Sequence, residues 1–248
     1  MSAAPGSVIR PRAPDGGWPD ADPFPDIGSA RTVAVVGNAP EQANAARAID
    51  AADRVFRFND AHGFGGSTGR RVTDLVLVNR GGAMDERLDG SGSDGARLED
   101  RAVLAAAPRV ILPINPGKDA LIRPPLDDGE WRDVRGECRT AEAVARLRGA
   151  GKDVRILTAG DFVAAAGALG VRELTRAMPA PSTGFLLVHA LLARAGPATR
   201  VTCHGFGHEG WEGHAFDREA AWFRAMERKG RIVLVPVPAS PHAPATAR

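Results

Sequence analysis

Residues 32–38 read Thr-Val-Ala-Val-Val-Gly-Asn, an apolar run that stops at a glycine and an asparagine. Such a run predicts a buried strand of a parallel sheet. Six further apolar runs alternate with helical patterns, which predicts an α/β fold with a mainly parallel sheet and helices on both faces. The seven predicted strands are 32–36, 55–58, 75–78, 110–113, 154–157, 201–204 and 232–235.

The helical patterns are less regular than the strands. The apolar stretch 185–192 predicts a buried central helix, ended by Gly196 and Pro197, and it is too short to span a membrane. Segments 81–95 and 113–139 are rich in glycine, proline and charge, so we expect exposed loops there. The predicted helices are 40–48, 96–106, 140–149, 160–168, 184–195 and 217–229.

The composition narrows the class of protein. A chain of 248 residues with 44% hydrophobic content can bury a real core. Its 32 basic residues are interleaved with 30 acidic ones, so we expect no nucleic-acid partner. Cys138 and Cys203 form no CxxC pair and no zinc-spaced cluster, so two free thiols are expected.

The ends of the chain differ in composition from its middle. Residues 1–30 are rich in Pro, Gly, Ala and Asp and predict a disordered leader, and residues 239–248 predict a disordered tail. The folded domain is expected at 31–238. No signal peptide and no transmembrane segment is visible, which predicts a cytoplasmic protein, with a peripheral position at the inner membrane left open.

Small and amide-bearing residues follow the first two predicted strands. Gly37 and Asn38 end the first, and Asn59 ends the second. A glycine there lets a ligand approach the backbone, and an amide donates to phosphate or ribose oxygens. By spacing alone, an ordinary strand-to-helix turn with Asn38 as a helix cap is the favoured explanation of the first pair. Neither a GxGxxG nor a Walker motif is present.

A second group of such residues lies late in the chain. Ser182, Thr183 and Gly184 precede the predicted buried helix, where Ser182 or Thr183 would serve as N-cap. A helix N-terminus is also a site for a carboxylate or a phosphate. Gly205 ends the sixth strand, so both groups are expected at the sheet edge where α/β proteins bind ligands.

One histidine is suited to proton transfer. His214 is expected at a helix N-terminus, where the dipole favours a neutral imidazole that accepts a proton. Glu219 is suited either to orient that ring or to cap the N-terminal amides. His189 is expected in the core, and the spacing of His204, His208 and His214 predicts no metal site.

Taken together, these motifs resemble the sialyltransferases of glycosyltransferase family 29. The large motif of that family is matched by residues 33–38, 49–50, 53–59 and 69–73. The small motif is matched from Pro181 to Gly207, and the very small motif by His214-x4-Glu219. The matches fall in the family's order.

The resemblance implies a single GT-A-like, Rossmann-type domain. It would move sialic acid, or a related nonulosonic or Kdo-type sugar, from a CMP-sugar donor to a hydroxyl of a glycan or glycolipid, with inversion and without metal or cofactor. Asn38 and Asn59 would contact the nucleotide, Ser182, Thr183 and Gly184 would hold the sugar carboxylate and the nucleotide, His208 would face the phosphate, and His214 would be the base.

Some features depart from the family pattern. Val33 stands where secretory members carry a disulfide cysteine, the chain has no tyrosine, and His204 replaces an aromatic residue. These departures indicate a bacterial, cytoplasmic relative. Two alternatives remain: a non-catalytic nucleotide- or glycan-binding module of the same fold, and another enzyme on a doubly wound fold, such as a dehydrogenase. The missing GxGxxG argues against the dehydrogenase.

Overall fold

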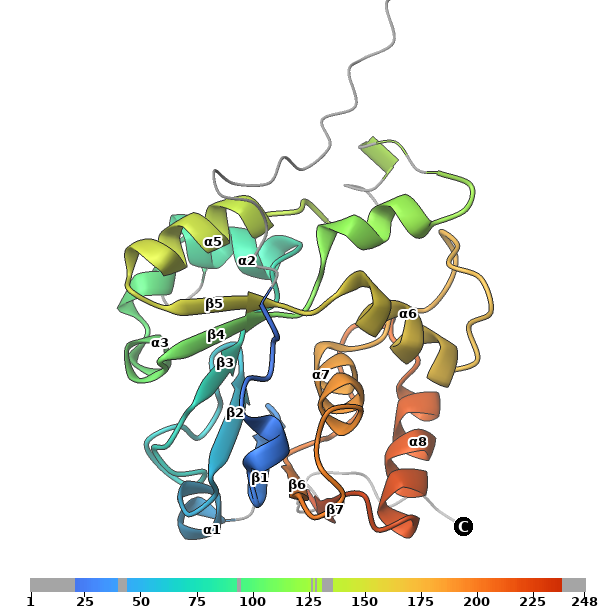
Figure 1. Cartoon of the computed structure of the whole chain (residues 1–248). Coiled ribbons are helices and arrows are strands. Elements are labelled where there is room, and N and C mark those ends of the chain that lie inside the picture. Colours follow the sequence, from blue (N-terminus) through green and yellow to red (C-terminus); the bar gives the residue numbers. More distant parts are fainter. Residues whose placement is uncertain are drawn as a thin grey trace, which may run out of the picture.

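A computed structural model describes residues 21–39, 44–92, 95–125, 127, 129–130 and 136–237. Its seven strands form one sheet in the order β5-β4-β3-β2-β1-β6-β7, and every neighbouring pair is parallel (Figure 1). All seven predicted strands are confirmed. They are β1 (Thr32–Val36), β2 (Arg54–Phe58), β3 (Asp74–Val76), β4 (Arg109–Leu112), β5 (Asp153–Ile156), β6 (Arg200–His204) and β7 (Val233–Val235).

Helices connect the strands. The described α-helices are α1 (Ala46–Asp50), α2 (Gly82–Asp89), α3 (Ala102–Ala106), α5 (Thr140–Gly149), α6 (Ala159–Ala168), α7 (Thr183–Leu192) and α8 (Phe216–Arg228). The short 3-10 helices are η1 (Ile27–Ser29), η2 (Leu98–Asp100) and η3 (Pro116–Leu121). Four predicted helices, those that became α5, α6, α7 and α8, are confirmed to within a few residues at their ends.

Three local predictions are wrong. Segment 81–95 is not all loop, because α2 lies in it and buries Met84 and Leu88 at i, i+4 spacing. The helix predicted at 96–106 is two pieces, η2 and α3, separated by the extended backbone of Arg101. Segment 113–139 contains η3. The helix predicted at 40–48 begins at Ala46, and residues 40–43 lie outside the described chain.

Alternate residues of the strands face two separate layers of core. Val33 and Val35 of β1 join the apolar cluster formed with α6, α7 and α8. Ala34 and Val36 face the other way and pack with Ile49 of α1, while α2, α3 and α5 cover β3, β4 and β5 on that same side. The predicted helices on both faces of the sheet are therefore confirmed.

Helix α7 is the most buried of the described helices. Seven of its ten residues are buried, as predicted for a central helix. The Ser182 hydroxyl accepts a hydrogen bond from Phe185 N at 3.2 Å and so caps the helix, because the first turn has no intrahelical acceptors. Within the described ranges, no helix has the length and apolar character needed to cross a membrane.

The folded domain begins earlier than the sequence predicted. Phe24 and Ile27 are buried in the core beside α7, and the Phe24 ring packs edge-on against Phe56 at 6.0 Å. The leader predicted at 1–30 therefore has to end before Phe24. The burial of one aromatic and one aliphatic side chain in the core outweighs the tendency toward disorder of the proline- and glycine-rich sequence around them. Residues 1–20 and the predicted tail 239–248 lie outside the described chain.

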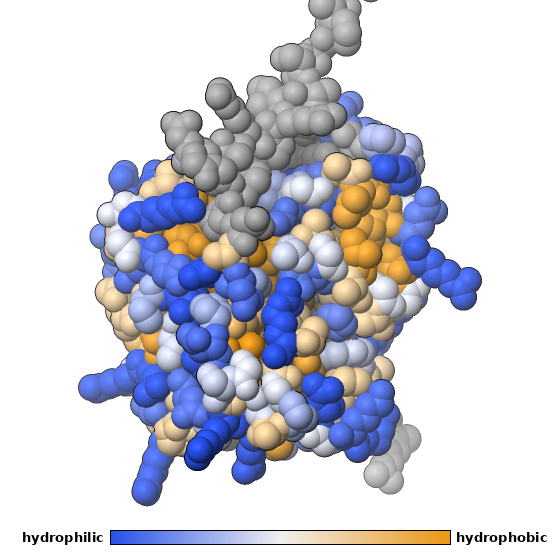
Figure 2. Space-filling view, in the orientation of Figure 1, coloured by the Kyte–Doolittle hydropathy of each residue, from blue (hydrophilic) through white to orange (hydrophobic). Residues whose placement is uncertain are grey.

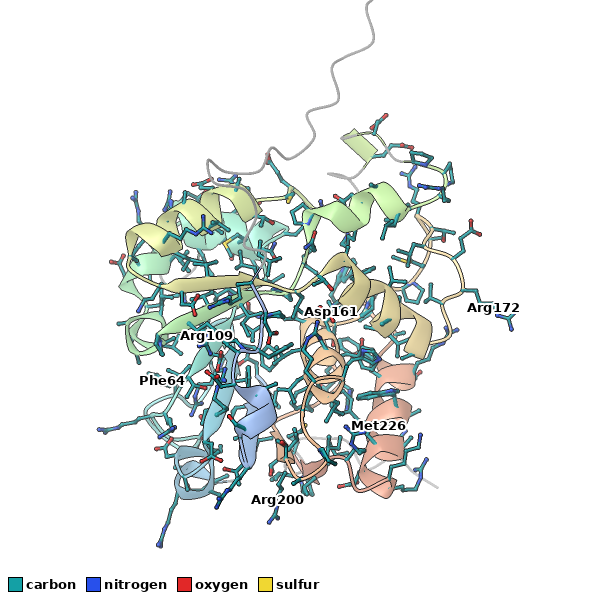
Figure 3. All side chains as sticks on the ribbon, in the orientation of Figure 1. Phe64, Arg109, Asp161, Arg172, Arg200 and Met226 are labelled. Atoms are coloured by element: carbon teal, nitrogen blue, oxygen red, sulfur yellow. The ribbon has the colours of Figure 1, made fainter. Side chains whose placement is uncertain are left out.

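Ion pairs gather at the amino-terminal edge of the sheet. Asp74 is fully buried and accepts hydrogen bonds from Arg54 at 2.8 Å and from Arg109 at 2.9 Å, the latter labelled in Figure 3. Elsewhere on the face drawn in Figure 2, hydrophilic and apolar side chains are intermingled over the described surface. Paired charges therefore hold the amino-terminal edge of the sheet.

At the carboxyl edge, asparagines tie each strand end to the next. Asn38 Nδ2, after β1, donates to Phe58 O at the end of β2 at 3.0 Å. Asn59 Oδ1, after β2, accepts from Val78 N beyond β3 at 3.1 Å. These side-chain bonds continue the sheet past the point where the main chains separate.

The same arrangement continues across the next two strands. Asn79, after β3, donates to Ile114 O at 2.7 Å and accepts from Ile114 N at 3.0 Å. Asn115, after β4, donates to Leu157 O beyond β5 at 3.0 Å. We call Asn38, Asn59, Asn79 and Asn115 the asparagine relay. It holds the edge of the sheet on which a ligand site would rest.

Replacing Asn79 by alanine should destabilise the fold. Asn79 is fully buried, so its loss leaves the N–H and C=O of Ile114 without partners, at a cost of about 2–4 kcal/mol in the free energy of unfolding. Asn115 is half-buried, so water can replace its amide, and Asn115→Ala should cost about 1 kcal/mol or less. Urea denaturation measures both. Equal losses for the two variants would contradict this account of the relay.

Candidate functional site

A pocket of about 560 Å³ opens at the carboxyl edge of the sheet, beside the ends of β1 and β6. The strand order reverses at this pair: β2 to β5 lie on one side of β1, and β6 and β7 lie on the other (Figure 1). Connections leave such a point in opposite directions and open a crevice, which is where α/β sheets bind ligands.

Every predicted site residue lines this pocket. The residues come from the ends of β1, β2 and β6, from the start of α7 and from the approach to α8. They are Gly37, Asn38, Asn59, Ser182, Thr183, Gly184, Gly205, His208, His214 and Glu219. The motifs that are far apart in the chain are therefore neighbours in the fold.

Gly37 makes a close approach, but to the protein's own backbone. A Cβ at position 37 would lie 2.3 Å from Gly205 O, where no side chain fits. Gly37 N donates to His204 O at 2.8 Å, and Ala39 N donates to Gly205 O at 3.1 Å. The close approach that the sequence suggested for a ligand is made by Gly205, and it joins the two strand ends that border the pocket.

The two asparagines at the pocket are partly committed to the relay. Asn38 also accepts from His62 N at 3.2 Å, and α1 begins only at Ala46, so Asn38 is not the cap of that helix. Asn59 has a φ of 51°, a left-handed conformation that asparagine tolerates. Among the described residues the Nδ2 group of Asn59 has no acceptor, and it is available to a ligand.

The start of α7 combines a satisfied cap with open donors. The Ser182 hydroxyl accepts from Phe185 N, so the predicted N-cap of this helix is confirmed. The N–H groups of Thr183 and Gly184 have no acceptor in the part of the chain that the structure describes. They lie at the positive end of the helix dipole and on the pocket wall, so an anion would find two donors there.

Glu219 has a different role from the one the sequence suggested. Its Oε1 accepts from Ser182 N at 2.7 Å, and its Oε2 accepts from Ser182 Oγ at 2.6 Å. Only 1% of Glu219 is exposed. The carboxylate neither orients His214 nor caps its own helix in these bonds. It fastens the start of α8 to the start of α7.

The ring of His214 is oriented by a backbone carbonyl. His214 Nδ1 lies 2.7 Å from Ala180 O, and because a carbonyl only accepts, Nδ1 carries the proton. In the neutral ring, Nε2 then has a free lone pair. Trp211 and Phe216 hold the ring from the sides at centroid distances of 5.0 and 5.3 Å. This tautomer can act as a general base.

His208 is an uncharged group in the pocket at neutral pH. It packs against Phe206 and Phe223. Burial, and then the nearby charge of Arg224, lower the pKa of His208 below its ordinary value. A phosphate at this position would receive a hydrogen bond from a neutral ring instead of a full positive charge.

The remaining positions of the 49–73 resemblance shape the loop from β2 to β3. Asp50 accepts from the backbone N–H groups of Arg70 and Arg71 at 3.0 and 2.8 Å. Arg57 is fully buried and donates to Thr68 Oγ1 and to Arg71 O. These residues do not line the pocket.

Two further predictions concern cysteine and metal chemistry. Cys138 and Cys203 are free thiols, as predicted. Within the described residues, no group of three or more His, Cys, Asp or Glu side chains is arranged to hold a metal ion.

The sequence did not reveal three residues that position His214: Ala180, Trp211 and Phe216. Of these, only Trp211 carried a signal, as a large aromatic residue in the polar segment 207–213.

Comparison with known proteins gives distant similarities. No protein-family model matches the chain. It is 29% identical over 211 residues to the urease operon 23 kDa accessory protein of Rhizobium meliloti (strain 1021), covering 82% of this chain and 92% of that protein. Two mammalian sialyltransferase structures, one in complex with Gal-beta-1-3GalNAc-ortho-nitrophenol, align with a TM-score of 0.47. Their identities are 19% and 17%, over 84% of this chain and 70% and 69% of theirs.

One buried and two half-buried histidines predict how stability depends on pH. Burial, and then the charge of Arg57, lower the pKa of His204, and burial also lowers the pKa of His189 and His208. Below about pH 6.5 the unfolded chain therefore binds protons before the folded one does. The free energy of unfolding should therefore decrease as the pH is lowered, by up to about 1.4 kcal/mol per pH unit for each histidine.

His204→Leu should make this fall less steep, because His204 is 5% exposed and leucine does not titrate. His62→Leu is the matched control, because it removes an exposed histidine side chain. Urea denaturation between pH 7 and pH 5 gives the slopes. A slope that His204→Leu leaves at the wild-type value would contradict the assignment.

Proposed function

We propose that this chain is an inverting, metal-independent glycosyltransferase. It moves sialic acid, or a related nonulosonic or Kdo-type sugar, from a CMP-sugar donor to a hydroxyl of a glycan or glycolipid. One observation carries the proposal: a helix N-terminus with open N–H groups and a histidine with a free Nε2 face the same pocket. The residues involved are those that resemble the family's motifs.

The donor side of the pocket suits an anionic leaving group. CMP leaves with a charged phosphate, which needs hydrogen-bond donors in place. Thr183 N, Gly184 N and Asn59 Nδ2 supply them, and His208 adds a neutral N–H. The described lining contains no lysine or arginine, so the dipole of α7 supplies the positive potential.

The base side suits activation of a hydroxyl. The acceptor oxygen attacks the anomeric carbon of the sugar from the face opposite the phosphate, the new C–O bond forms as the bond to the phosphate oxygen breaks, and the configuration inverts. His214 Nε2 takes the hydroxyl proton. The Nδ1–H···O bond to Ala180 then stabilises the imidazolium that forms.

A second candidate is a non-catalytic nucleotide- or glycan-binding module of the same fold. The observation in its favour is the name of the curated relative, an accessory protein. Such a module would bind CMP in the pocket and turn nothing over. It has no need for a histidine locked in the tautomer of a base, so we place the transferase first.

The transferase should release CMP from CMP-Neu5Ac or CMP-Kdo in the presence of EDTA. His214→Ala should lower this release by roughly 10²–10⁴-fold, because it removes the base and leaves the donor site intact. CMP should still raise the melting temperature of the variant. His62→Ala, at an exposed histidine, is the control and should keep wild-type release.

Two outcomes would change the proposal. Unchanged CMP release in His214→Ala would remove this histidine as the base. Stabilisation by CMP, with no release from either donor on any acceptor tested, would favour the binding module.

A further inference from the structure

The chain leaves the sheet at the rim of the pocket. Strand β7 runs parallel to β6, with Val235 level with His204, so the residues after β7 emerge at the carboxyl edge beside Gly205. Val237 is half-buried and lines the pocket. It is also the last residue that the structure describes, and the sequence continues through residues 238–248. That segment therefore starts at the pocket wall.

The described wall of the pocket supplies little positive charge for a phosphate. A phosphate monoester carries about 1.5 to 2 negative charges near neutral pH, whereas a helix N-terminus supplies roughly half a positive charge. The acidic residues of the lining are Glu209 and Glu219, and the lining residues that the structure describes include neither lysine nor arginine. A cation from outside this lining would complete the charge balance around a bound phosphate.

The cation nearest in effect is not placed for this task. Arg224 lowers the pKa of His208, so its charge is felt at the pocket. Its side chain is exposed on α8, however, and it does not line the pocket. In water, such a charge is strongly screened.

The segment 238–248 has the charge that the described wall lacks. It contains His242 and Arg248 and has no aspartate or glutamate. This charge is complementary both to the two acidic residues of the lining and to a phosphate.

The segment is also long enough to cross the pocket. Prolines at positions 238, 241 and 244 favour an extended backbone, which rises about 3.1 Å per residue. Residues 238–248 can therefore span up to about 34 Å. A sphere with the volume of the pocket is only about 10 Å across. The spare length lets the segment bend back toward the start of α7.

We propose, on the basis of the donor site described above, that residues 238–248 form a strap across the mouth of the pocket, and that Arg248 binds the phosphate of the nucleotide. The ligand class is a nucleotide with a phosphate next to its ribose. The planar guanidinium of Arg248 donates two N–H groups to two phosphate oxygens. The strap closes when the phosphate arrives, so the pocket is open to an incoming donor.

The test compares the full chain with Arg248→Ala and with a chain that ends at Val237. The Kd values of CMP and of cytidine are measured by calorimetry, because cytidine has the same base and ribose but no phosphate. Arg248→Ala should weaken CMP binding roughly 10-fold or more and leave the Kd of cytidine within twofold. The chain that ends at Val237 should lose at least as much affinity for CMP.

Two controls separate this effect from damage to the fold. Thr246→Ala changes the same segment without changing its charge and should keep the wild-type Kd of CMP. The melting temperature without ligand should be the same for the full chain and for all three variants.

Protease protection gives a second readout that needs neither turnover nor a Kd. Proteinase K should cleave within residues 238–248 of the ligand-free chain, and mass spectrometry follows the products. Saturating CMP should slow this cleavage several-fold, whereas saturating cytidine should not. Arg248→Ala should abolish the protection by CMP.

Three results would overturn the strap. One is the same Kd of CMP for the full chain, for Arg248→Ala and for the chain that ends at Val237. Another is an equal loss of CMP and cytidine binding, which would place the segment on the nucleoside instead of the phosphate. The third is tighter binding of CMP by either variant, because the segment would then be an inhibitory contact with the acidic residues of the lining.

The failure of the strap and the failure of the proposed transfer can be told apart. If the phosphate-selective loss appears but no donor releases CMP, the strap stands and the transfer fails. If CMP is released and its Kd does not respond to Arg248→Ala or to the deletion, the strap fails and the transfer stands.

Discussion

The buried carboxylate of Glu219 holds two helix starts together, and the geometry of the pocket depends on it. Both of its oxygens accept hydrogen bonds from Ser182, one from the backbone N–H and one from the hydroxyl. A buried carboxylate is costly unless it is hydrogen-bonded, so the two bonds fix its position firmly. They tie the open N–H groups at the start of α7 to the start of α8, next to His214, on the same pocket.

Contacts elsewhere in the fold hold the surroundings of the Glu219–Ser182 pair in place. Gly37 and Gly205 bring the ends of β1 and β6 into direct backbone contact. The asparagine relay then links the ends of five neighbouring strands, β1 to β5. A site on such a support keeps its N–H donors and His214 in place without help from a ligand, which the proposed transfer requires.

Much of this arrangement was readable from the sequence, for a physical reason. Short apolar runs and glycine-asparagine endings mark parallel strands, and all parallel strands end at one edge, so Asn38, Asn59 and Gly205 had to lie near one another. Ser182 was readable as a cap because the start of an apolar helix needs one.

Other features left little trace in the sequence. The partner of Glu219 lies 37 residues away, and a carbonyl such as Ala180 O has no residue-type signature at all. Helix α2 was missed because only a few apolar residues are enough to bury one side of it, and Phe24 was missed because the composition around it resembles a disordered segment. In each case a long-range contact decides the local structure.

The most direct measurement is the affinity for CMP after removal of one backbone donor at the start of α7. Thr183 is the first residue of the helix, where proline is well accepted, and Ser182 before it has the extended conformation that proline requires. Thr183→Pro therefore deletes one N–H and keeps the fold, whereas Thr183→Ala removes the same hydroxyl and keeps the N–H. The account predicts that Thr183→Pro binds CMP roughly 10-fold or more weakly than Thr183→Ala. Equal affinities for CMP would contradict it.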